Sequence, residues 1–132
     1  VTLVYMIREV DESLFLIYNY ITMNTIKWND FEKIELRTGT IVDVQDFPEA
    51  RTPAYIVTVD FGDFGHKRSS AQITNLYDKE ELIGKQIIGV INFLPKKIGS
   101  FMSEFLITGF YRDDGVVLAV PDKDLEDGLK LG

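Results

Sequence analysis

The sequence contains no cysteine and a single histidine, His66. Without cysteine the chain cannot form a disulfide bond, a thiolate metal site or a cysteine nucleophile. One histidine cannot supply the several imidazole ligands of a histidine metal site. We therefore expect neither a metal nor another cofactor, and the absence of cysteine favours a cytoplasmic location.

Basic residues are outnumbered by acidic ones. The 14 Lys and Arg residues face 21 Asp and Glu residues, which gives a formal net charge of −7. This balance weighs against adhesion to nucleic acid by bulk charge, so any such binding must use a local basic patch. At 132 residues the chain is long enough for one domain with one hydrophobic core.

Long hydrophobic runs are also absent. The apolar stretch 14–21 is shorter than the roughly 20 residues that cross a bilayer as a helix. Mixed charges precede it and no small-residue cleavage site follows, so we expect neither membrane insertion nor a signal peptide. Two interpretations of the N-terminal extension 1–27 remain open. It is either an extra element packed on the domain or a segment upstream of a functional start at Met23.

Short β-branched segments dominate the single domain expected over 28–132. Residues 40–45 alternate in the pattern of a half-buried strand. Gly39 permits a bulge or bend near its start, and Pro48 stops it because proline has no N–H for a ladder. Similar patterns predict strands at 54–61, 66–73, 85–93 and 104–111, and a further strand at 115–120.

The remaining segments predict turns and loops. A short helix is expected over 78–82, capped by Asn75 or Asp78 and ended by Gly84. The opening segment 28–36 reads as a helical turn whose tryptophan, Trp28, covers the core. Residues 95–103 read as a loop, and the acidic end as a solvated tail. The predicted class is all-β, a five-stranded OB-fold barrel with a short helix and additional flanking strands and helical turns.

Several separated segments carry a family resemblance. They are Arg-Thr-Gly-Thr-Ile (37–41), Phe-Pro-Glu-Ala-Arg (47–51), Ser-Ser-Ala-Gln-Ile (69–73), Asn-Phe (92–93) and Pro-Lys-Lys-Ile-Gly-Ser-Phe-Met-Ser-Glu (95–104). Together they resemble the tRNA-binding OB-fold domain family, and the length and the Asp-Phe-Glu-Lys opening (30–33) resemble its CsaA branch of export chaperones. The resemblance spans 31–132. It implies a homodimer, tRNA binding and, for the CsaA branch, binding of unfolded or precursor polypeptides, with export machinery as a further partner.

Candidate nucleic-acid contacts lie in these segments. Lysine and arginine offer charge for phosphates, and hydroxyl and amide groups offer hydrogen bonds. The strand at 66–73 is expected to present one basic, hydroxyl-rich face, and the lysine pair at 96–97 lies in a loop where OB folds take ligands. Arg37 either contacts phosphate or pairs with Glu35. The full set is Arg37, Lys67, Arg68, Ser69, Ser70, Gln72, Asn92, Lys96, Lys97 and Ser103.

Candidate peptide contacts are the aromatic and thioether side chains beside the lysine pair. Phe93, Phe101 and Met102 suit either base stacking or apolar peptide side chains. Phe101 lies among glycine and serine and is expected to be exposed, whereas Phe105 lies in an apolar strand and is expected to be buried.

No set of residues supports catalysis. The acidic residues of 122–127 lack the glycine and terminal glutamate of a calcium loop. A serine at 69 or 70 with His66 has no strained nucleophile turn. Two nonenzymatic functions therefore remain: a chaperone that binds polypeptide in an apolar groove, and a module that binds tRNA. Negative charge favours the first, especially for basic presequences, and the serine and lysine motifs favour the second.

Overall fold

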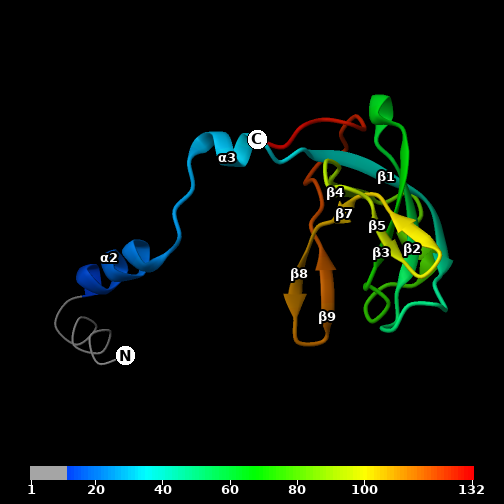
Figure 1. Cartoon of the computed structure of the whole chain (residues 1–132), viewed down its shortest axis with the longest axis horizontal. Helices are drawn as coiled ribbons and strands as arrows, with labels where there is room; N and C mark the ends of the chain where they lie inside the picture. Colours follow the sequence, from blue (N-terminus) through cyan, green and yellow to red (C-terminus); the bar gives the residue numbers. More distant parts are fainter. Residues whose placement is uncertain (1–11) are drawn as a thin grey trace. The chain divides into compact units, whose positions relative to one another are not determined.

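The computed structural model describes residues 12–132, which divide between Lys33 and Ile34 into two compact units (Figure 1). Part of the predicted extension 1–27 lies outside the described residues. The first unit contains α2 (Glu12–Thr22) and α3 (Trp28–Glu32). No residue of α2 is buried. No helix within 12–132 is long and apolar enough to span a bilayer.

The helix α3 begins where the sequence predicts a turn. A carboxylate oxygen of Asp30 accepts a hydrogen bond from the Lys27 N–H at 3.0 Å, which caps the first turn. The Trp28 ring lies 5.5 Å from the Phe31 ring. Trp28 nevertheless remains 68% exposed, rather than covering a core as expected.

The second unit is built on a five-stranded antiparallel sheet in the order β3-β2-β1-β4-β7. The strands are β1 (Leu36–Asp46), β2 (Tyr55–Asp60), β3 (His66–Ala71), β4 (Gln86–Val90) and β7 (Leu106–Ile107), with a 3-10 turn, η1 (Gly62–Phe64), before β3. The sheet curls into a nearly closed barrel (Figure 1). The short helix α4 (Lys79–Leu82) lies between β3 and β4. This arrangement confirms the predicted OB fold.

The barrel core is packed against two glycines. The Phe61 ring is fully buried and meets Phe105 edge-on at 5.0 Å. A Cβ atom on Gly39 would lie 2.4 Å from a Val59 methyl group, and one on Gly89 would lie 2.8 Å from the Phe61 ring. Gly39 is therefore required for close packing. The β1 bulge itself lies three residues later, where the pairing register shifts between Ile41 and Asp43.

The segment predicted as a loop is a hairpin, so that prediction is wrong. Its strands are β5 (Lys96–Ile98) and β6 (Phe101–Ser103). Phe101 points into a second small core with Phe47 and Ala54 and is only 6% exposed. The predicted exposed ring at this position is therefore also wrong, because the hairpin needs an apolar anchor to lie on the barrel.

The predicted fifth strand at 104–111 is divided in two. Its first part is β7, and its second part, β8 (Gly109–Arg112), forms a hairpin with β9 (Gly115–Leu118). Thr108 lies between them and donates both its N–H and its hydroxyl to the Ile88 carbonyl, at 3.0 and 2.7 Å. The strand at 115–120 therefore exists but pairs with β8.

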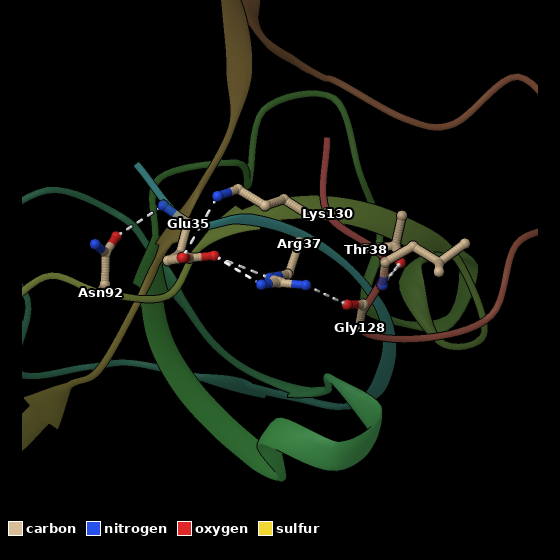
Figure 2. Close-up of polar contacts among 7 residues, drawn as sticks. Glu35, Arg37, Thr38, Asn92, Gly128 and Lys130 are labelled. Carbon is tan, nitrogen blue, oxygen red and sulfur yellow. Dashed lines mark hydrogen bonds and ion pairs between the residues drawn. The ribbon is translucent and has the colours of Figure 1, made fainter. Parts of the chain in front are cut away.

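The acidic C-terminal segment lies on β1 rather than in solvent. The Gly128 N–H donates to the Thr38 carbonyl at 2.7 Å, and the Thr38 N–H donates to the Leu129 carbonyl at 3.0 Å. The buried Thr38 hydroxyl also donates to the Glu126 carbonyl at 2.7 Å. Figure 2 shows this tail over β1. The expected solvated tail is thus wrong for 126–131, because β1 offers a free edge there that backbone groups can satisfy.

Candidate functional site

A groove of about 630 Å³ lies beside β3 and β7, the two edge strands of the five-stranded sheet. Its walls are the end of β3 and the residues after it, β5, β7 and the β8–β9 hairpin. Ser70, Gln72 and Lys96 line it, and all three were predicted from sequence as nucleic-acid contacts. Its apolar side chains include Ile98, Leu106, Ile107, Tyr111 and Val116.

The seam beside this groove is closed mainly by side chains. The Glu104 N–H donates to the Arg68 carbonyl at 2.8 Å, and the Glu104 carboxylate accepts from the Arg68 N–H at 3.1 Å. The Ser70 N–H then donates to the Ser103 hydroxyl oxygen at 3.2 Å. The Ser69 hydroxyl donates to the Phe105 carbonyl at 2.8 Å. These bonds give Ser69 and Ser103 structural partners.

The predicted basic face on β3 is divided between two sides of the sheet. Side chains alternate along a strand, so Lys67 and the buried Ser69 share one side with Val57 and Val59, their partners on β2. Arg68 and Ser70 lie on the other side. The expectation of one face was wrong because it ignored this alternation. Arg68 lies 4.9 Å from the centre of the Phe101 ring, which places its charge beside the hairpin.

The hairpin presents the lysine pair to solvent. Lys96 lies opposite Ser103 and Lys97 lies opposite Met102. Both lysines are exposed. No ion pair among residues 12–132 involves either lysine. Their charges are therefore available to an anionic ligand.

Two other predicted contacts lie in a different network, shown in Figure 2. Arg37 donates two hydrogen bonds to Glu35, at 2.8 and 3.1 Å, and one to the Gly128 carbonyl at 3.1 Å. The Asn92 side-chain oxygen accepts the Glu35 N–H at 3.0 Å. Of the two roles left open for Arg37, the structure shows pairing with Glu35. This pairing anchors the tail.

Electrostatic coupling in this network is reflected in the pKa of Glu35. The hydrogen bonds from Arg37 lower the pKa of this carboxyl, and the nearby charge of Lys130, 3.5 Å away, acts in the same direction. Other shifted groups lie elsewhere on the domain. Arg112 lowers the pKa of Asp114, and Asp46 raises the pKa of Lys79.

The predicted apolar contacts have mixed surroundings. Phe93 is 57% exposed and Met102 is 43% exposed, whereas Phe101 is buried. Sequence reasoning missed Leu106 and Tyr111, which line the groove and are 50% and 96% exposed. Tyr111 has the same parity as the buried Phe105, so alternation gave no signal for it. For Leu106 the period-two pattern of 104–111 offered a signal, since every second side chain of such a strand faces away from the core. It was overlooked because the segment was read as a barrel strand.

No metal-binding cluster accompanies the groove in the described part of the chain. Within residues 12–132 no group of three or more histidine, cysteine or acidic side chains is placed to hold a metal ion. In the same part of the chain every buried side-chain nitrogen and oxygen has a hydrogen-bond partner. The arrangement offers apolar surface, hydrogen-bonding groups and positive charge, which are means of binding.

Comparison with known proteins assigns this architecture. Residues 36–130 match the family model described as "Putative tRNA binding domain". The crystal structure of the CsaA chaperone protein from Picrophilus torridus is 52% identical, covers 82% of this chain and all of that one, and has a TM-score of 0.78. The chaperone CsaA from Bacillus anthracis str. Ames is 43% identical over 83% of this chain and all of that one, with a TM-score of 0.79.

Methionine–tRNA ligases share the same domain. The enzyme from Pyrococcus horikoshii is 36% identical over 109 residues, which is 83% of this chain and 15% of the ligase. The chain thus spans about one seventh of the curated relatives it matches.

Proposed function

We propose that this chain, which belongs to the tRNA-binding-domain family and is of the CsaA type within it, is a nonenzymatic chaperone that binds unfolded or export-bound polypeptides. The proposal places it in the cytoplasm, as a homodimer. Ligase activity is not carried over, because the chain corresponds only to a small part of the methionine–tRNA ligases.

The observation that carries this proposal is the apolar groove. Leu106 and Tyr111 hold large apolar surfaces in water beside Ile98, and exposed apolar surface in a concave site is typical of a binding site for apolar ligands. Met102 adds a soft side chain on the neighbouring hairpin. A net charge of −7 keeps such a protein soluble while its groove stays exposed.

Adjacent residues on β8 provide a matched test. Tyr111 lines the groove, whereas Phe110 does not, although both rings are largely exposed. Tyr111→Ser should reduce suppression of aggregation of a chemically unfolded client protein, because it removes apolar contact surface. Phe110→Ser should leave suppression close to the unaltered level. If both variants lost aggregation suppression equally, or if neither lost it, the result would count against the groove as the chaperone site.

A second candidate function is tRNA binding. Arg68, Lys96 and Lys97 place positive charge on β3 and the adjacent hairpin, and Ser70 and Gln72 add hydrogen-bonding groups. Such a patch can hold phosphates although the whole molecule is acidic. The family match at 36–130 supports this candidate.

The proposed homodimer has support in exposed apolar surface that does not line the polypeptide groove. Val120, Leu125, Leu129 and Leu131 are 42–49% exposed and border a second hollow of about 450 Å³ beside the tail. Apolar surface of this kind favours self-association. From the apolar strand pattern at 115–120 and the opening segment 28–36 we further predict that these two segments form the two-fold interface.

A further inference from the structure

The strand β7 has one paired edge and one edge that faces the groove. It pairs with β4 through Val90 opposite Leu106 and Gly89 opposite Ile107. The Thr108 N–H donates to the Ile88 carbonyl. Because antiparallel pairs alternate between hydrogen-bonded and non-hydrogen-bonded types, Leu106 and the Thr108 N–H bond toward β4, while the Thr108 carbonyl accepts the Ala119 N–H at 3.1 Å. The N–H and C=O of Ile107 between them must point away from β4, toward the groove.

The opposite wall is the end of β3, and it does not complete a ladder with β7. Across this seam the direct backbone bond is that of Glu104 to Arg68, and the next links run through the hydroxyl groups of Ser103 and Ser69. Farther along, Ser70, Gln72 and Ile107 all line the groove. The barrel therefore leaves an open strand edge inside a hollow, and an open edge is a template for an added strand.

The groove lining carries charge of one sign, which is positive. Of the residues that the structure describes, Lys96 is the sole charged one that lines the groove. No ion pair within 12–132 neutralises this lysine. Arg68 and Lys97 lie on the adjoining strands. A ligand with a carboxylate beside its apolar residues would complement this lysine, whereas a basic ligand would meet repulsion.

We propose that the groove binds an extended polypeptide segment by strand addition to β7, through the N–H and C=O of Ile107. Alternate apolar side chains of the segment pack against Leu106 and Tyr111, and an acidic residue beside them contacts Lys96. This inference rests on the proposed polypeptide-binding function and specifies its ligand. Main-chain bonding makes recognition tolerant of sequence, which suits many clients. The local charge of Lys96 selects acidic over basic segments, which reverses the preference for basic presequences expected from the net charge.

Hydrogen exchange of three neighbouring amides tests the main-chain pairing. The probe is a synthetic ten-residue peptide of alternating valine and serine that ends in two aspartates. The Ile107 amide should exchange rapidly in the free protein and at least about tenfold more slowly with saturating peptide, since a backbone hydrogen bond forms. The Thr108 amide bonds to the Ile88 carbonyl and Leu106 pairs with Val90 on β4, so the amides of these two residues serve as internal controls. An Ile107 amide whose exchange does not change with peptide bound would overturn strand addition.

A second experiment tests the preference for acidic peptides. A peptide that ends in two lysines should bind at least about tenfold more weakly than the aspartate peptide, and Lys96→Gln should remove most of this difference. Equal binding of both peptides by the unaltered protein would overturn the acidic preference. If neither peptide binds while the same protein still suppresses client aggregation, strand addition is wrong and the chaperone function stands. If aggregation is not suppressed either, the proposed function fails with it.

Discussion

The carboxylate of Glu49 accepts hydrogen bonds from both the N–H and the hydroxyl of Ser100, at 3.1–3.2 Å. These two residues lie 51 positions apart in the sequence. Gly99 lies so close that a Cβ atom there would be 2.6 Å from the Glu49 carboxylate, and its φ is +59°. The loop after β1 is therefore fastened to the turn of the hairpin that carries Lys96 and Lys97.

Loss of this fastening should loosen the hairpin. We expect Glu49→Ala to lower the free energy of unfolding by about 1 kcal/mol, since the bonds are exposed and partly replaced by water. Amide exchange over 96–103 should accelerate more than exchange in β1. Glu49→Gln is the matched control, because it keeps one acceptor oxygen and should have a smaller effect. Unchanged hairpin exchange in Glu49→Ala would show that the small core around Phe101 holds the hairpin alone.

Much of the barrel was predictable because its strands carry a local signal. Alternation in 40–45 and the β-branched run at 54–61 predicted β1 and β2, and Asp78 and Gly84 marked the helix between β3 and β4. The β5–β6 hairpin was not predictable in this way. Each of its strands has three residues, too few to show a period, and its stability comes from Phe101 packing on Phe47, a long-range contact.

The site was predicted in composition but not in arrangement. Ser70, Gln72 and Lys96 do come together in the groove. The Ser69 hydroxyl instead bonds to the Phe105 carbonyl in the barrel seam, and the Arg37 side chain bonds to the Gly128 carbonyl of the tail. Each of these two hydrogen bonds depends on which distant chain segment the fold places next to the side chain. The sequence does not reveal whether a hydroxyl or guanidinium group will bond to a carbonyl that is distant along the chain, and such a bond leaves the group less available to a ligand.

The Glu35–Arg37 pair predicts a pH dependence of tail docking. The pKa of Glu35 is lowered in the folded state, so its stabilisation is present above the unfolded-state pKa and is lost as the pH falls through the lower folded-state pKa. We expect the unaltered protein to be more stable than Glu35→Gln at pH 7. The difference in the free energy of unfolding between the two proteins should decrease below about pH 4.3, where free glutamate protonates. Urea unfolding of both proteins from pH 7 to below about pH 4.3 measures this difference. A difference that does not change with pH would contradict a contribution from the Glu35 carboxylate.

The N-terminal unit predicts tolerance of truncation. No residue of α2 is buried, so a protein that starts at Met23 should fold with a melting temperature close to that of the full chain. It should also form the proposed dimer. Calorimetry and light scattering at micromolar concentration check the two expectations separately. A large drop in melting temperature would show that α2 buries apolar surface, and a monomer would show that residues before Met23 complete the interface.

The lysine pair on β5 separates the two candidate ligands. Lys96→Glu with Lys97→Glu should weaken tRNA binding and reduce the slope of log affinity against log salt by up to about 2, because fewer counterions are released. Met102→Ser, opposite Lys97 on the same hairpin, should leave that slope nearly unchanged because it alters no charge.

A double change of Lys27 and Lys85 to Glu is the control for net charge, since Lys27 is exposed, Lys85 is half-buried, and neither lines the polypeptide groove or the hollow beside the tail. It alters the total by the same amount and should have the smaller effect on the slope. Filter binding at several salt concentrations, with circular dichroism to verify the fold, measures the difference. If both double variants lose affinity equally, tRNA senses only the overall charge. The hairpin then serves polypeptide binding alone, since a local site requires that position as well as charge matter.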